Sequence, residues 1–188
     1  MPLWLSLAFA QAPPSPPLQP GSTEWAITTG GGVRIAGGAR EGHFWAMQLR
    51  WGRVLTAPHG PGWLRGSLAY AFEVVPAMVM AQSETIFGGG FNPLLLQYNF
   101  AGRDRPGRRL VPFLQAGGGM LFTAADVPAG TAQFNFTPQG GVGAYWLRGD
   151  RPSVVIGLRY HHISNAGRVR PNPGHNALYF YGGMSWWR

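Results

Sequence analysis

Residues 64–74 read LRGSLAYAFEV, and in this stretch every second side chain is of the same kind. One set is bulky and apolar and comprises Leu64, Leu68, Tyr70, Phe72 and Val74. The other set is small, polar or charged and comprises Arg65, Ser67, Ala69, Ala71 and Glu73. Successive side chains of a β-strand point to opposite faces. The stretch therefore predicts a strand with one apolar face and one polar face.

The same alternation continues along the chain from Thr23. About eight such runs are separated by Gly- and Pro-rich breakers, for example APHGPG at 57–62. The runs cover residues 23–35, 42–55, 62–78, 85–100, 109–123, 131–148, 152–165 and 176–187. No segment of useful length has a helical period, and every connection is short. An all-β fold follows, in which consecutive strands pair as an antiparallel meander.

Two kinds of barrel would present such faces to their surroundings. A soluble lipid-binding barrel buries the apolar rows, whereas a membrane barrel turns them outward and keeps a polar interior. The predicted strands often exceed the roughly 9–11 residues that a tilted transmembrane strand needs. Charged residues make up only 12% of the chain, so the polar rows are too poor in charge for a water-exposed surface. We therefore predict an eight-stranded antiparallel up-and-down transmembrane β-barrel of the outer-membrane type, with a narrow interior filled by side chains.

Particular side chains take roles in this barrel. We expect charged residues of the inward rows to pair with one another, namely Glu24, Arg34, Arg50, Arg65, Glu73 and Arg159. We expect aromatic residues near the strand ends to lie at the membrane interfaces, namely Trp51, Tyr98, Trp146, Trp186 and Trp187. The glycine triplets 30–32 and 88–90 lack a following helix and suit strand bends or close packing.

The chain divides into three parts. Residues 1–12 (MPLWLSLAFAQA) resemble a short, truncated signal peptide, residues 13–22 form a Pro-rich linker, and residues 23–188 form the barrel. There is no cysteine, which excludes thiolate chemistry, and the formal net charge is +8. The basic residues are scattered apart from the cluster at 102–109, so nucleic acid is not an expected partner.

The segment YHHISNAGRVRPNPGHN, residues 160–176, is the chemically richest part of the chain. Alternation places His162 and Ser164 side by side at the end of an apolar row, about 7 Å apart between Cα atoms. An imidazole at that spacing can accept the serine proton. The spacing by itself favours a polar pair at the barrel rim over a hydrolase site. The histidines are not spaced as metal ligands, and no metal or cofactor is expected.

Longer strings carry a family resemblance. RYHHISNAG (159–167) and PNPGHN (171–176) follow GFNPLLLQYNF (90–100), VPFLQAGGGMLFT (111–123) and FNFTPQGGVGAYW (134–146). Together they resemble the lipid A 3-O-deacylase family, the PagL-type acyloxyacyl hydrolases. The resemblance implies an outer-membrane esterase that removes the ester-linked acyl chain from the 3-position of lipid A or a similar glycolipid. It implies Ser164 as nucleophile, His162 as general base, and Asn165, Gly167 and Asn172 as residues that shape the oxyanion region.

The third member of the site differs from the family pattern. The position of the usual acid is occupied by Asn176. Either Asn176 orients His162 and gives a slower enzyme, or a carboxylate from elsewhere replaces the acid. Glu41 is the nearest candidate because the first strand closes the barrel against the eighth, whereas Asp126 and Glu84 lie farther round. A non-catalytic structural barrel that keeps the same scaffold is the alternative function.

Orientation follows from the even strand number, which places both termini on the periplasmic side. The connections after the first, third, fifth and seventh strands then face the outside, and the site lies near the outer leaflet. Lipid A or lipopolysaccharide is the expected partner. Arg168 and Arg170 could meet its phosphates, although solvated loop charges are the simpler interpretation.

Overall fold

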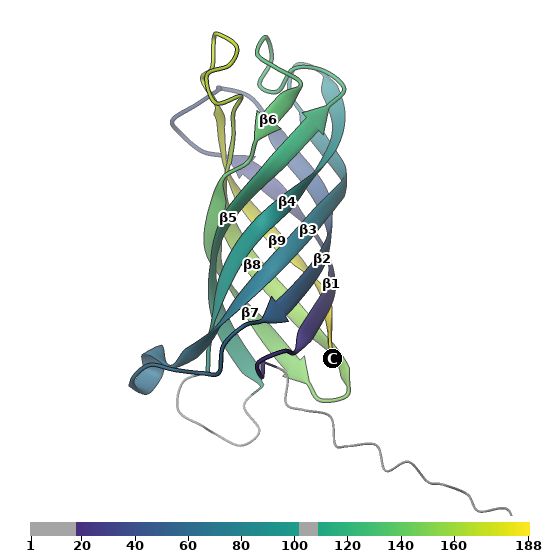
Figure 1. Cartoon of the computed structure of the whole chain (residues 1–188). Helices are drawn as coiled ribbons and strands as arrows, with labels where there is room; N and C mark the ends of the chain where they lie inside the picture. The colour runs from purple at the N-terminus through teal and green to yellow at the C-terminus, as the bar shows by residue number, and fades with distance from the viewer. Residues whose placement is uncertain (1–17, 102–108) are drawn as a thin grey trace, which may run out of the picture.

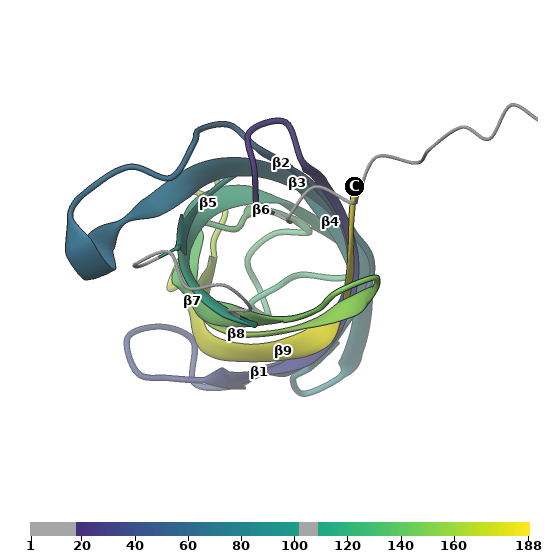
Figure 2. The same ribbon diagram turned by 90° about the horizontal axis from the view of Figure 1, so that it is seen from below.

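The strands form one closed barrel in the computed structural model, which describes residues 18–101 and 109–188 (Figures 1 and 2). The predicted signal peptide, the first part of the predicted linker and nearly all of the basic cluster at 102–109 lie outside the described residues. The described part of the chain contains no helix with the length and hydropathy needed to cross a membrane.

Nine strand segments run antiparallel to their neighbours around the barrel. They are β1 (Thr23–Arg34), β2 (His43–Val54), β3 (Gly66–Ala81), β4 (Thr85–Phe100), β5 (Leu110–Thr123), β6 (Phe134–Phe136), β7 (Gln139–Arg148), β8 (Arg151–Ile163) and β9 (His175–Trp187). The pairing of β1 with β9 closes the sheet on itself, so that each strand has a neighbour on both sides. The fold is the predicted up-and-down barrel.

The strand count is eight, because β6 and β7 are two parts of one strand. Both pair with β5 in succession, with Asn135 opposite Leu121 and Gly141 opposite Gln115. Pro138, which has no N–H to donate to the ladder, lies between them. Its carbonyl instead accepts a hydrogen bond from the backbone N–H of His162 at 3.0 Å. The continuous run predicted at 131–148 is therefore wrong in this detail.

The third predicted run is also corrected at both ends. Residues Gly62–Leu64 form a 3₁₀ turn (η1), and β3 extends from Gly66 to Ala81. Gly60 and Gly62 have φ angles of +98° and +52°, which turn the chain out of extended geometry before β3 begins. Leu64 consequently lies outside the strand, and the connection between β2 and β3 is longer than the short turn predicted there.

The apolar rows face outward, as the membrane interpretation predicts. Ile27 of β1 and Trp45 of β2 belong to apolar rows and are 49% and 44% exposed on the outside. Glu73 belongs to the polar row of β3 and is 1% exposed. The small and polar residues of the opening stretch, Ser67, Ala69 and Ala71, are buried inside with it. An apolar exterior around a polar, hydrogen-bonded interior is the arrangement of a transmembrane barrel.

Paired charges occupy the barrel interior. Arg159 Nη2 lies 2.7 Å from Glu73 Oε1, and Arg50 Nη1 lies 3.4 Å from the same oxygen. Arg50 Nε lies 3.1 Å from Glu24 Oε2. These four residues of the predicted charged set are buried, and each lies beside at least one residue of opposite charge. The other two members of the set lie elsewhere, since Arg34 ends β1 and Arg65 precedes β3.

The predicted interfacial aromatics divide between the two faces. Trp146 and Trp186 are exposed on the outer face, and Trp51 and Tyr98 are half-buried on the same face. Trp187 points inward and meets the ring of Tyr145 edge-on, with 5.3 Å between the ring centroids. Its assignment to the interface was wrong because neighbouring strand residues alternate in direction.

The glycine triplets allow close packing between strands. A Cβ atom at Gly30 would strike the backbone carbonyl of Phe180, and one at Gly90 would strike that of Met120. Glycine at both positions therefore lets adjacent backbones approach, which confirms the predicted role of the two triplets.

Candidate active site

The predicted site residues gather where β8 ends and β9 begins. This is the end of the barrel opposite the C-terminus, here called the upper end (Figure 1). Residue pairing sets His162 directly opposite Asn176. Ser164 follows β8 and exchanges two backbone hydrogen bonds with Phe136, at 2.8 Å and 3.1 Å. The rim of the outer face thus carries the three predicted residues on adjacent segments.

Asn176 is the most strongly connected side chain of the site and is 8% exposed. Its Oδ1 lies 2.5 Å from Nδ1 of His162 and accepts a hydrogen bond from the Tyr160 hydroxyl at 2.7 Å. Its Nδ2 donates to the carbonyl of Ala36 at 3.4 Å and to that of Gly37. The asparagine thus joins His162 to the connection between β1 and β2.

Gly174 provides the space in which the His162 ring sits. A Cβ atom at this position would lie 2.7 Å from Cε1 and 3.3 Å from Nε2 of His162. The residue also has a φ of +67°, which glycine adopts without strain. The backbone of Gly174 therefore forms one wall of the imidazole site, a role that the sequence analysis missed.

Ser164 lies on the same face as His162, two residues further along, and both side chains are half-buried. No hydrogen bond between the Ser164 hydroxyl and His162 is among those of the described residues. Such bonds are often long in enzymes without substrate and shorten in the complex. The contact of His162 with Asn176 uses Nδ1, so Nε2 is the ring nitrogen left for Ser164.

Asn165, Gly167 and Asn172 shape the loop that follows Ser164. The backbone N–H of Asn165 donates to Asn172 Oδ1 at 3.3 Å, and Asn165 Nδ2 donates to the Val169 carbonyl at 3.1 Å. Gly167 has a φ of +76° in a turn closed by a 3.2 Å bond from the Arg168 N–H to the Asn165 carbonyl. Asn165 therefore organises the loop through its side chain rather than pointing it at the site.

The remaining predicted residues lie apart from His162. Arg168 stacks over the ring of Phe134 at 5.6 Å, and Arg170 is exposed in the loop. In the described ranges no hydrogen bond or ion pair links Glu41, Glu84 or Asp126 to His162, and Glu84 and Asp126 line a separate pocket. No group of three or more metal-ligating side chains is found among the described residues.

The two other histidines of this region are built into the interior. His161 packs against the Phe44 ring at 5.2 Å between centroids, and Phe44 also meets the ring of His175 at 6.5 Å. His161 therefore points away from the outer face, as the alternation predicts. Of the three histidines around the end of β8, His162 alone stands beside Ser164 on the outer face.

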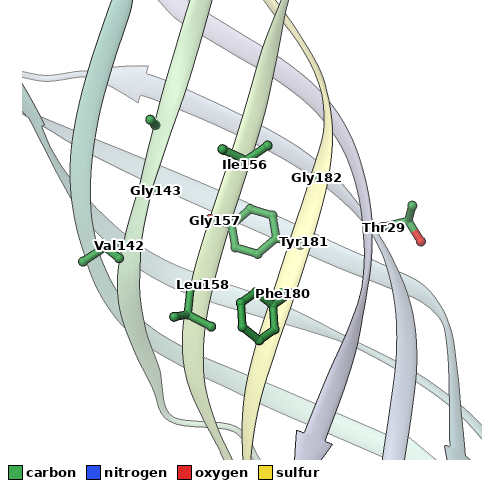
Figure 3. A pocket seen from close by; sticks show the side chains of 10 residues that line it. Thr29, Val142, Gly143, Ile156, Gly157, Leu158, Phe180, Tyr181 and Gly182 are labelled. Carbon is green, nitrogen blue, oxygen red and sulfur yellow. The ribbon is translucent and has the colours of Figure 1, made fainter.

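An apolar groove of about 500 Å³ lies on the outer wall below the site (Figure 3). Ile156, Leu158 and Phe180 project along it, and small residues form its floor, including Ala144 and Gly182. Leu158 is four residues from His162 on the same row of β8, or roughly 13 Å at the rise of a strand. The groove and the polar rim thus share one face of the barrel.

Fold and outer surface together define a class: this is a small eight-stranded barrel of the kind that spans outer membranes. The sequence narrows the class further, since a family model for lipid A 3-O-deacylase (PagL) matches residues 29–185. The chain therefore belongs to the PagL family of lipid A deacylases, which confirms the resemblance seen in the sequence. No curated protein matches the chain in direct sequence comparison.

Solved structures agree on the fold. The crystal structure of the outer membrane enzyme PagL has a TM-score of 0.60 and 19% identity, covering 86% of this chain and 98% of that one. The crystal structure of the outer membrane protein OprG from Pseudomonas aeruginosa has a TM-score of 0.55 and 10% identity, covering 90% and 96%. At these identities the likeness establishes the barrel and nothing finer.

Proposed function

We propose that this protein is an outer-membrane esterase that removes the acyl chain at the 3-O position of lipid A, or of a similar glycolipid. Its catalytic residues are Ser164 and His162, and Asn176 orients the histidine. The observation that carries the proposal is the 2.5 Å contact between His162 Nδ1 and Asn176 Oδ1. It supplies the base with an orienting partner on the face that bears the serine, in a chain whose family deacylates lipid A.

The reaction is a two-step acyl transfer. Ser164 Oγ attacks the ester carbonyl carbon while His162 Nε2 takes the serine proton, and the carbonyl electrons move onto oxygen. Collapse of this intermediate breaks the bond to the sugar oxygen, which leaves with the proton held by His162. Water then attacks the acyl-serine with His162 again as base, releasing the fatty acid and restoring Ser164.

Donors for the developing oxyanion come from the loop after Ser164. Asn172 accepts a hydrogen bond with Oδ1, so its Nδ2 group remains as a donor for the substrate oxygen. In this proposal the loop that Asn165 and Gly167 shape would bring the Asn172 amide to the ester oxygen. Arg168 and Arg170 on the same loop suit the phosphates of lipid A.

The lipid-facing wall suits the rest of the substrate. An acyl chain leaving the ester would continue into the apolar groove along Leu158, Ile156 and Phe180. The ester would then lie at the barrel rim, where the headgroup of a membrane lipid lies. We place the upper end on the outside of the cell, because an even strand number puts both termini on the periplasmic side.

The test is hydrolysis of lipid A by the purified protein in detergent. Ser164→Ala and His162→Ala should each lower fatty-acid release on the order of 10⁴-fold, because the two groups act as one unit. The double variant should lose little more than either single variant. Ser83→Ala and His59→Ala, which lie outside the site, are the controls. If the wild type releases no fatty acid, the structural barrel becomes the better account, and full activity in Ser164→Ala would refute the site.

A further inference from the structure

The side-chain amide of Asn176 has four hydrogen-bonding neighbours from two separate segments. Tyr160 and His162 of β8 approach Oδ1, at 2.7 Å and 2.5 Å. The carbonyls of Ala36 and Gly37, in the connection after β1, lie at Nδ2. Both lone pairs of the amide oxygen and its N–H donors are therefore engaged.

The two backbone carbonyls determine which way the amide faces. A carbonyl oxygen can only accept, so the NH₂ group must point toward Ala36 and Gly37. The reversed amide would place its oxygen against two other oxygens and leave them without a donor. Oδ1 consequently faces His162.

This orientation fixes the proton on the imidazole. Oδ1 offers no hydrogen, so the bond at His162 Nδ1 requires that Nδ1 carry the proton. Nε2 is then unprotonated, which is the tautomer that a base beside a serine needs. An asparagine that could turn over would instead donate to Nδ1 and produce the opposite, inactive tautomer.

Tyr160 holds the amide from the membrane side. Its ring stands on the outer row two residues before His162, and its hydroxyl reaches diagonally across the β8–β9 pair to Asn176. The tyrosine thus occupies the second lone pair of Oδ1 opposite the carbonyls of Ala36 and Gly37. The tyrosine hydroxyl alone, or the two carbonyls alone, would leave the amide free to tilt. The hydroxyl and the carbonyls together hold the amide from both sides.

We propose that Tyr160 is a positioning residue, which fixes the Asn176 amide together with the carbonyls of Ala36 and Gly37. The fixed asparagine can then orient the base at the position where the family pattern has an acid. The proposal rests on the function proposed above and explains how the chain remains a hydrolase without the usual carboxylate. Tyr160 acts through Asn176 and needs no contact with the substrate.

The kinetic test is Tyr160→Phe, which keeps the ring and removes the hydroxyl. We expect kcat for fatty-acid release from lipid A to fall about tenfold with KM little changed, the loss that corresponds to one hydrogen bond of about 1.4 kcal/mol. Tyr70→Phe is the matched control, because Tyr70 is also an outward tyrosine, with its hydroxyl bonded to the Pro93 carbonyl at 2.6 Å. Unchanged kcat in Tyr160→Phe would overturn the proposal.

A spectroscopic test separates this proposal from the proposed function. In ¹⁵N-histidine-labelled protein, with His162→Gln to assign the signal, His162 should be protonated at Nδ1 in the wild type. Tyr160→Phe and Asn176→Ala should shift the signal toward a mixture of tautomers, and Tyr70→Phe should not. A wild-type His162 protonated at Nε2 would overturn the proposal even if lipid A is hydrolysed. If lipid A is not hydrolysed, the proposed function is refuted. The tautomer of His162 in the wild type and in Tyr160→Phe still tests whether Tyr160 positions Asn176.

Discussion

Four residues place the proposed chemistry of this protein on one small area of its outer face. His162 comes from the end of β8, Ser164 directly follows β8, Asn176 comes from the start of β9, and Gly174 comes from the loop between the two strands. The site depends as much on where side chains are absent as on where they are present, since Gly174 makes room for the imidazole.

Substitution of Gly174 tests this requirement for space. Gly174→Ala should lower kcat at least tenfold, because the new Cβ would lie 2.7 Å from His162 Cε1 and displace the ring. Gly130→Ala is the control, since Gly130 has a similar φ of +70° with nothing within 4 Å of the added atom. Alanine is disfavoured at the positive φ of both positions, which lowers the stability of each variant by about 1–2 kcal/mol. Only the difference in kcat between the two variants therefore reports on the site. Equal activity of the two would show that His162 does not depend on Gly174.

The sequence predicted part of this site. Alternation along 152–165 placed His162 and Ser164 on one face, and the family resemblance added Asn176. No role could be predicted for Tyr160, because the position of a tyrosine in a strand does not say where its hydroxyl group ends. The contact of Asn176 with Gly37 joins positions far apart in the chain, so it depends on barrel closure and loop conformation rather than on any local pattern.

At the scale of the strand, alternation decides both the inside and the outside of the barrel. It predicted the outward rows and the buried charges, because a period of two is a property of every strand. It did not predict the break between β6 and β7 at Pro138 or the 3₁₀ turn before β3. Those features depend on single proline and glycine residues whose effect is local.

An arginine on the outer face tests whether that face meets lipid. Ile27 stands in the middle of β1 and is 49% exposed. Ile27→Arg should lower the free energy of unfolding in lipid vesicles by about 2–4 kcal/mol, the cost of an arginine near the bilayer midplane. Ser83→Arg, in the exposed connection after β3, should have little effect. Equal stability of the two variants in urea titrations would contradict a lipid-facing β1.

The molecule as a whole is held by closure of the sheet and by the charges within it. A closed barrel has no free edge from which unfolding could begin. Glu73 is central to the interior because it pairs with both Arg50 and Arg159. Closure and these pairs join strands from across the barrel, so stability is a property of the complete ring.

Removal of the central carboxylate should weaken the entire barrel. The folded protein should resist SDS at room temperature and change its gel mobility after boiling. Glu73→Gln leaves two buried arginines short of a partner and should cost about 3–5 kcal/mol, lowering the temperature of the mobility shift. Glu84→Gln, at an exposed carboxylate, is the control. An unchanged transition in Glu73→Gln would show that the interior pairs add nothing to stability.

Mass spectrometry of lipid A from Gram-negative cells that produce this protein tests the central claim most directly. Cells with the wild-type chain should contain lipid A that lacks one ester-linked 3-hydroxyacyl chain at the 3-position, with the free fatty acid as the second product. Cells with equal amounts of folded Ser164→Ala protein should contain intact lipid A. Intact lipid A in the presence of folded wild-type protein, or the same loss of acyl chain with Ser164→Ala, would contradict the account.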